Sequence, residues 1–189
     1  MTDIGLPGTL MTAEQLYDLP DRDKRYELVR GELRVSEPPG YAHGVLAVQI
    51  ASCLTAYVTP RKLGVVTVES GYVLHRGPDT VRGPDVSFIR RDRRPSAERA
   101  HLLVEGPADL SVEIVSPSER RADIAEKVAD ALGGGVRLVW VIYPKTRHAV
   151  VHTPGGSPQI VRADGSLDGG DVVPGFSLLL ADLFAVLDD

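Results

Sequence analysis

The sequence predicts a single α/β domain, at the boundary with the α+β class, in which helices flank a mixed β-sheet. Three observations support this fold class. Three strand-like runs, VVTVES (65–70), GYVLHR (71–76) and DVSFIR (85–90), are broken by Gly, Pro and Asp. Residues 109–143 follow a strand, helix, strand pattern, and the last of these strands is continuously apolar, as in strands covered on both faces. A length of 189 residues fits one domain, residues 1–189, and residues 1–11 are predicted to form a flexible N-terminal arm.

The first third of the chain contains two predicted helices and a hairpin. A short helix is expected from Ala13 to Leu19. The run Tyr26–Val35 alternates apolar and polar residues around a central Arg-Gly pair, which predicts a β-hairpin. Residues 42–58 carry apolar side chains at helical spacing and predict a longer helix. Cys53 lies on the apolar stripe of that helix and is predicted to be buried and unreactive.

The clearest strand pattern is Asp109–Ser116, in which apolar and polar positions alternate. Leu110, Val112 and Ile114 are predicted to point to one face, whereas Ser111, Glu113 and Val115 point to the other.

A helix is predicted to follow this strand directly. Ser116 would be its N-cap, Pro117 its first residue and Glu119 the partner in a capping box. Gly133–Gly135 would end it. The apolar run Arg137–Pro144 then forms a second strand, so residues 109–143 would make a right-handed β-α-β crossover if the two strands are parallel.

Composition excludes several classes of protein. A single cysteine rules out an internal disulfide framework and a Cys-rich zinc site. No apolar run approaches 18 residues, so no membrane-spanning helix is expected, and the N-terminus lacks the features of a secretory signal. The chain is therefore expected to be cytoplasmic, without a membrane partner. The glycine run at 133–135 lacks the Lys-Ser/Thr of a phosphate-binding loop, and no organic cofactor is expected.

The net charge of −5 argues against a protein that coats nucleic acid without regard to sequence. The charge is nevertheless uneven. Residues 82–99 contain six arginines against Asp85, Asp92 and Glu98. The arginines at 90–94 are candidates for contacts along a phosphate backbone, and the alternative is that they solvate a loop.

Three polar residues are candidates for phosphodiester chemistry. Asp85 follows a Gly-Pro pair at the start of a strand, Glu113 lies in mid-strand among apolar neighbours, and Lys127 lies on the following helix. Divalent metals that act on phosphodiesters need hard oxygen ligands, and a nearby lysine can hold water or stabilise the transition state. Each residue also has a structural explanation: a Pro-Asp turn, a solvated sheet face, and a helical ion pair between Lys127 and Asp123.

Several fragments in this order resemble a known family: YELVRGEL, His43 in the next helix, GPDVSFI, PADLSVEIVSPSERRADIAEK and RLVWVIYP. They are similar to the Uma-type family of bacterial restriction-endonuclease-like proteins, which belongs to the PD-(D/E)XK nuclease superfamily. The resemblance extends from about Tyr26 to the C-terminus. It implies a restriction-endonuclease-like mixed β-sheet flanked by helices, and an endonuclease that hydrolyses DNA with Mg²⁺ or Mn²⁺, expected to act as a homodimer.

The resemblance also implies roles for individual residues. Asp85 and Glu113 would be metal ligands, and the backbone carbonyl of Ile114 would add a third. The superfamily lysine is replaced by Val115 here, and Lys127 matches the position to which the lysine moves in the Uma-type pattern. Lys127 would position or activate the attacking water. Glu27 and His43 match recurring family positions and would line the site.

The chain departs from the family pattern at two places. Ala131 stands where a tyrosine is frequent, one turn after the lysine, and the run at 133–135 is richer in glycine. Two alternatives to a DNA endonuclease remain open. The first is a module that binds nucleic acid or protein and keeps the nuclease fold without cutting. The second is a metal-dependent hydrolase of RNA or of a small phosphoester.

Overall fold

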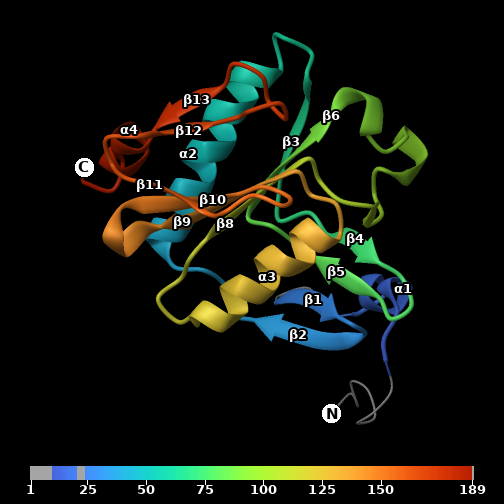
Figure 1. Cartoon of the computed structure of the whole chain (residues 1–189). Helices are drawn as coiled ribbons and strands as arrows, with labels where there is room; N and C mark the ends of the chain where they lie inside the picture. The colour runs from blue at the N-terminus through green and yellow to red at the C-terminus, as the bar shows by residue number, and fades with distance from the viewer. Residues whose placement is uncertain (1–9, 21–23, 189) are drawn as a thin grey trace.

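The computed structural model describes residues 10–20 and 24–188. Within these residues a six-stranded sheet lies at the centre, with a helix on each face, and a smaller sheet extends below it (Figure 1). The helices are α1 (Ala13–Tyr17), α2 (Tyr41–Val58), α3 (Arg121–Gly133) and α4 (Leu180–Ala185). Residues 1–9, the greater part of the predicted N-terminal arm, lie outside the described residues.

The central sheet is mixed, as predicted, with the order β11-β10-β9-β8-β6-β3. Its parallel pair is β8 with β9, and α3 connects these two strands, which confirms the predicted β-α-β unit. The other pairs in this sheet are antiparallel. The strands are β3 (Gly64–Val68), β6 (Val86–Arg90), β8 (Leu110–Ile114), β9 (Leu138–Tyr143), β10 (His148–His152) and β11 (Gln159–Val161).

The two faces of the central sheet bury different clusters. Leu110, Val112 and Ile114 of β8 pack with α2 in the larger cluster, together with the fully buried Trp140 of β9. On the opposite face α3 packs against Val139 and Val141 of β9 in a smaller cluster. The alternation read from residues 109–116 is therefore correct. It directs Glu113 to the side of the sheet that α3 covers.

A second, five-stranded sheet has the order β2-β1-β5-β4-β7. Its hairpin turns at Arg30 and Gly31, which both have positive φ and so form the tight turn predicted from the Arg-Gly pair. The Met11 N–H donates to the Gly31 carbonyl at 2.8 Å, so the chain just before α1 is attached to this turn. The strands are β1 (Arg25–Val29), β2 (Glu32–Ser36), β4 (Tyr72–His75), β5 (Thr80–Arg82) and β7 (Val104–Glu105). A separate pair comprises β12 (Ser166–Asp168) and β13 (Ser177–Leu179).

The start predicted for the helix after β8 is wrong. Its N-cap is Arg120 rather than Ser116, and α3 begins at Arg121. The Glu119 carboxylate does accept from the Ser116 N–H at 2.8 Å, as in a capping box. However, its other oxygen binds Lys127 at 2.8 Å. This second contact turns the preceding segment back toward α3, and the helix begins only after that turn.

One prediction for α2 needs correction. Cys53 is half-buried rather than buried, and burial together with Asp182 raises the pKa of its thiol, which keeps it protonated. In addition, α2 is long and apolar enough to span a membrane by length and composition, with a mean hydropathy of 1.3, although no spanning helix was expected. The helix carries no Asp, Glu, Lys or Arg, and His43 is its only titratable nitrogen-containing side chain. Its buried stripe packs on the central sheet, as in a core helix.

Candidate active site

The site is built around Asp85, which immediately precedes β6. In the antiparallel register, Val86 pairs with Val112 of β8, so Asp85 lies level with Glu113 on the neighbouring strand. The Asp85 carboxylate is 2% exposed and accepts the Ile114 N–H at 2.6 Å. Its side chain therefore continues the ladder between the two strands beyond the end of β6.

Two side chains from outside the central sheet, Arg25 and His43, complete the surroundings of Asp85. Arg25, the first residue of β1, places Nη1 2.6 Å from Oδ1. His43, in the first turn of α2, places Nε2 3.0 Å from Oδ2. Two segments far apart in sequence, β1 and α2, thus meet at one carboxylate, in addition to the contact from β8.

Glu113 and Lys127 form a largely buried ion pair on the α3 side of the sheet. Lys127 Nζ lies 3.1 Å from Glu113 Oε2 and 2.8 Å from Glu119 Oε1. The solvated sheet face considered for Glu113 is wrong, since the residue is 7% exposed. Lys127 makes these contacts rather than a helical ion pair with Asp123, whose carboxylate binds Arg120 instead. The structure therefore brings Asp85, Glu113 and Lys127 together.

Glu27 lies on the same face of β1 as Arg25, two residues further along, but both of its oxygens are engaged. Oε1 accepts the Gly83 N–H at 2.8 Å, and Oε2 accepts from Arg82 Nη1 at 2.9 Å. Arg82 in turn bonds Asp130 of α3 at 2.6 Å. Glu27 therefore fixes the turn that carries Asp85 and connects β1 to α3 through Arg82.

The electrostatic environment separates the two central carboxylates. Burial opposes ionisation of Asp85, but the hydrogen bond from His43 and the charge of Arg25 outweigh it and lower the pKa of Asp85 to about 2. Burial dominates at Glu113, and despite the opposing charge of Lys127 it raises the pKa to about 7. Burial also disfavours the charged form of Lys127, yet the pKa of Lys127 is raised because Glu113, Glu27 and Glu119 surround it.

The donor set fits a divalent cation in its chemistry. Asp85 and Glu113 present hard carboxylate oxygens on adjacent strands, and cations already lie against both of them. Within residues 10–20 and 24–188, no three His, Cys, Asp or Glu side chains converge closely enough to hold a metal ion by themselves. A complete ligand set would therefore need a main-chain oxygen or water as well.

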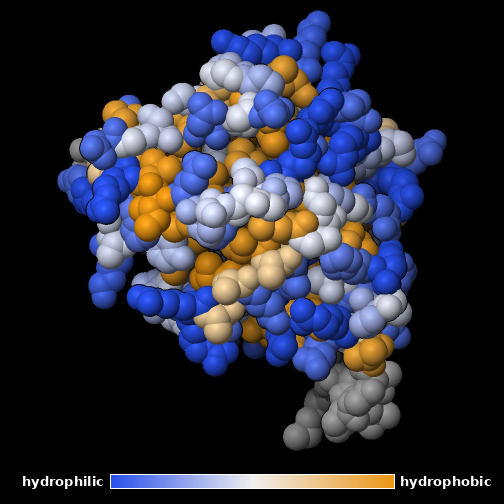
Figure 2. Space-filling view, viewed as in Figure 1, coloured by the Kyte–Doolittle hydropathy of each residue, from blue (hydrophilic) through white to orange (hydrophobic). Residues whose placement is uncertain are grey.

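A cavity of about 480 Å³ opens beside this site, between β1, β2 and α3. Figure 2 shows that hydrophilic residues predominate at the lower edge of this face, where α3 begins beside the hairpin. The cavity is lined by both signs of charge, and its basic residues are Arg25, Arg34, Arg82, Arg120 and Lys127. An anionic ligand entering here would meet Arg34 and Arg120 before it reached Lys127, because these two are the more exposed side chains.

The arginines at 90–94 lie elsewhere. They follow the far end of β6, five residues from Asp85, which corresponds to roughly 17 Å along an extended strand. Arg93 binds the buried Asp109 at 2.8 Å and the Pro107 carbonyl at 2.9 Å. At least Arg93 therefore has a structural role.

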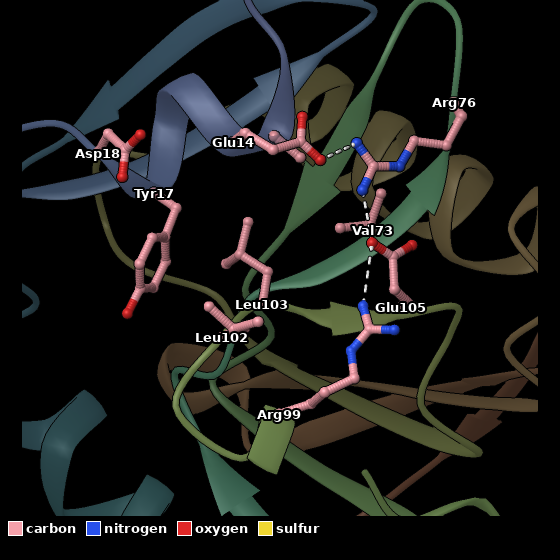
Figure 3. Close-up of a pocket in the computed structure, with 10 residues that line it drawn as sticks. Glu14, Tyr17, Asp18, Val73, Arg76, Arg99, Leu102, Leu103 and Glu105 are labelled. Carbon is pink, nitrogen blue, oxygen red and sulfur yellow. Dashed lines mark hydrogen bonds and ion pairs between the residues drawn. The ribbon is translucent and has the colours of Figure 1, made fainter. Parts of the chain in front are cut away.

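A second cavity, of about 320 Å³, lies between α1 and the segment 99–105. Figure 3 shows Glu14, Arg76, Glu105 and Arg99 connected in a chain, with Asp18 apart from it. Arg76 bonds Glu14 at 2.8 Å and Glu105 at 2.5 Å, and Arg99 lies 3.9 Å from Glu105. These charges neutralise one another at the surface, whereas the carboxylates of the site around Asp85 are buried.

Sequence reasoning missed two residues of the site, Arg25 and Glu119. A signal for Arg25 existed, since residues two apart on a strand share a face and Arg25 precedes Glu27 by two positions. Glu119 was interpreted only as a helix cap. The contact from Glu119 to Lys127 follows from a turn that local propensity does not reveal.

Comparisons with known proteins identify a family and a shared fold. A family model described as "Uma2: Putative restriction endonuclease" matches residues 13–181. A solved structure from Anabaena variabilis ATCC 29413, described as a putative nuclease belonging to DUF820, superposes with a TM-score of 0.83. The two chains are 20% identical, and the match covers 94% of this chain and 99% of the other, so it establishes a shared fold. No curated protein matches the chain.

Proposed function

Because the chain belongs to the Uma2 family of restriction-endonuclease-like proteins, we propose that it is a metal-dependent endonuclease that hydrolyses phosphodiester bonds in DNA. One observation carries the proposal: the buried pair Glu113–Lys127 lies level with the buried Asp85 and beside a cavity with basic residues in its wall. A buried acid, a buried lysine and an adjacent cavity form a site that stability alone does not require.

Asp85 and Glu113, together with the Ile114 carbonyl, would hold Mg²⁺ or Mn²⁺. When bound, such an ion supplies electrophilic stabilisation of the phosphate and lowers the pKa of water. His43 would act as a positioning residue, because its Nε2 contacts Oδ2 of Asp85. Glu27 would also position the site, since it fixes the turn at Gly83.

Lys127 would orient the attacking water and stabilise negative charge on the phosphate. Its ammonium group is held at the bottom of the cavity by Glu113 and Glu119, so its position is fixed before substrate arrives. In the reaction, the water oxygen forms a bond to phosphorus as the bond from phosphorus to one sugar oxygen breaks. The water proton passes to solvent, and the leaving sugar oxygen takes up a proton.

A specific observation also supports a second candidate, a module that binds nucleic acid without cutting it. Arg25, His43 and the Ile114 N–H occupy both oxygens of Asp85. If this arrangement were permanent, Asp85 would be unable to bind a metal and the fold would serve binding alone.

Cleavage of supercoiled plasmid by purified protein in Mg²⁺ or Mn²⁺ separates the two functions. Wild type should produce nicked or linear DNA, and Glu113→Gln and Lys127→Met should each abolish it. Lys145→Met, which removes an exposed lysine on the loop after β9, is the matched control and should retain activity. Activity that survives both site variants would contradict the proposal. Plasmid binding without products would favour the non-cutting module.

We further infer that the enzyme acts in the cytoplasm as a homodimer, because cutting both strands of a duplex calls for two active sites. The mass in solution, measured by light scattering after size exclusion, should be twice that of one chain. A mass that corresponds to one chain at micromolar concentration would contradict the dimer while leaving strand nicking possible.

A further inference from the structure

The side chain of Arg25 lies where a cation must lie to neutralise the site. Its Nη1 is 2.6 Å from Asp85 Oδ1, and its charge interacts with three acidic groups: Asp85 just before β6, Glu113 on β8 and Glu27 on its own strand β1. A divalent ion held by Asp85 and Glu113 would face the same charges. Arg25 and such an ion therefore compete for one position.

The contact between Arg25 and Asp85 does not use the whole guanidinium group. Arg25 Nη2 is buried and has no hydrogen-bond partner within the described part of the chain. Leaving a buried donor of a charged group unpaired is unfavourable. An arginine built purely to stabilise the fold would be expected to satisfy both terminal nitrogens, as Arg147 does with Asp188.

A route away from Asp85 is open to this side chain. Arg25 also lines the cavity of about 480 Å³ beside the site, along with Arg34 and Arg120. A guanidinium group that rotates away from Asp85 would enter this cavity, where a phosphodiester would lie. There both terminal nitrogens could donate to phosphate oxygens, which suits the fork geometry of arginine.

We propose that Arg25 is a displaceable counter-ion, which neutralises Asp85 before metal binds and moves into the cavity to contact the DNA phosphate afterwards. This inference rests on the proposed metal-dependent function. It accounts for two observations together: the complete occupation of the Asp85 oxygens and the unpaired nitrogen of Arg25. It also assigns a binding residue outside the set predicted from sequence.

The decisive measurement is Mn²⁺ affinity, determined by calorimetry in the absence of DNA. Arg25→Met should bind Mn²⁺ roughly tenfold or more tightly than wild type, because the ion no longer has to break a charge-assisted hydrogen bond. Arg25→Lys keeps the positive charge but lacks the two terminal nitrogens of the guanidinium group. Its Mn²⁺ affinity should lie between those of wild type and Arg25→Met. Arg34→Met removes a charge from the same cavity without touching Asp85, and should change the affinity by less than about threefold.

A thermal unfolding readout tests the same competition without relying on calorimetry. Without metal, Arg25→Met should unfold at a lower temperature than Arg34→Met, because the carboxylates around Asp85 lose their counter-charge. Added Mn²⁺ should stabilise Arg25→Met more than wild type.

An Mn²⁺ affinity of Arg25→Met equal to or below that of wild type would overturn the inference, as would an equal gain in Arg34→Met. Absence of Mn²⁺ binding in wild type and in Arg25→Met would overturn it together with the proposed metal site. The two failures are distinguishable through Asp85→Asn. If wild type binds Mn²⁺ and Asp85→Asn does not, the metal site stands whatever the Arg25 variants show.

Discussion

Among the individual residues, Glu113 and Lys127 form a largely buried ion pair whose burial is costly to stability. Taking two charges out of water is costly, and their mutual attraction compensates only when both partners are present. Here Lys127 has a second partner in Glu119, whereas the pKa of Glu113 remains raised to about 7 by its burial. Lys127 is therefore held firmly in place, whereas Glu113 has a pKa close to neutral pH.

The coupling of this pair can be measured in the folded protein without metal. Lys127→Met should lower the free energy of unfolding by about 3 kcal/mol at pH 8, because it leaves Glu113 buried and unpaired. In the Glu113→Gln background, the same Lys127→Met substitution should cost much less. Urea unfolding of the four proteins in the double-mutant cycle gives the interaction free energy, and additive effects would contradict direct coupling.

Whether a site residue can be predicted from sequence alone depends on how local its interactions are. Glu113 was predicted because alternation along one strand specifies its face, and Lys127 because it follows on the next helix. Arg25 and Glu119 were missed because their partners, Asp85 and Lys127, are reached through tertiary contacts. No local pattern encodes the convergence of β1, α2 and β8 on one carboxylate.

At the scale of the elements, the register of the strands determines how the site residues are placed relative to one another. Asp85 lies level with Glu113 because β3, β6 and β8 keep a continuous antiparallel register. That register depends on a close approach at the first residue of β3. A Cβ atom on Gly64 would lie 2.0 Å from the Ile89 carbonyl oxygen and 2.6 Å from a ring carbon of Phe88. Only glycine fits between these groups.

Two glycine substitutions test this packing, and they are expected to change the free energy of unfolding in opposite directions. Gly64→Ala should destabilise the protein by roughly 1–3 kcal/mol, because β3 must separate from β6. Gly44→Ala lies within α2, where an added Cβ meets nothing within 4 Å, and should stabilise by about 0.5–1 kcal/mol. Urea unfolding measures both values. Similar effects from the two substitutions would show that backbone entropy, rather than the close contact, governs position 64.

The attachment of α1 predicts a pH dependence of stability. Asp79 accepts the Ala13 N–H at the start of α1 and the Gly77 N–H in its own turn. Burial opposes its ionisation, but these hydrogen bonds and Arg76 outweigh it, so the pKa of Asp79 is lowered. A lowered pKa in the folded state contributes stability above the unfolded pKa of about 3.9, and this is lost as pH falls through the folded value.

Asp79→Asn should accordingly lower the melting temperature near pH 6, and its difference from wild type should shrink as the pH approaches 2. Melting curves recorded from pH 2 to pH 6 provide the measurement. Asp171→Asn, at an exposed position, is the control for the substitution itself. A difference from wild type that stays constant or grows toward low pH would contradict the assigned role.

Element boundaries show the limit of local patterns. The strand pair β8 and β9 was predicted because β8 alternates apolar and polar residues and β9 is a continuously apolar run. The strands β5 and β12 were missed because each spans three residues and is defined by its partners, β1 and β4 for the first and β13 for the second. The N-terminus of α3 was misplaced because a capping pattern at Ser116 was satisfied by a turn instead.

For the molecule as a whole, the net charge of −5 means that the proposed DNA substrate would have to be attracted by a local surface. Two groups of arginines are available. Arg34 and Arg120 lie at the cavity beside the site. The arginines at 90–94 lie at the opposite end of β6, where Arg93 is already bound to Asp109. Under the proposed function, contacts near the scissile phosphate would need the first group, whereas the second group would contact only more distant phosphates.

The salt dependence of DNA binding distinguishes these two surfaces. In a Glu113→Gln background, which prevents cleavage, replacing both Arg34 and Arg120 by Gln should weaken binding and reduce the slope of log affinity against log salt by about 1.8, since each lost phosphate contact contributes about 0.9. Replacing Arg91 and Arg94 by Gln is the matched control with the same change in net charge. Fluorescence anisotropy on a short duplex between 50 and 200 mM salt covers a range over which such slopes are well resolved. If the second pair lowers the slope and the first does not, DNA approaches from the far end of β6, and the cavity beside Glu113 is not the path of its backbone.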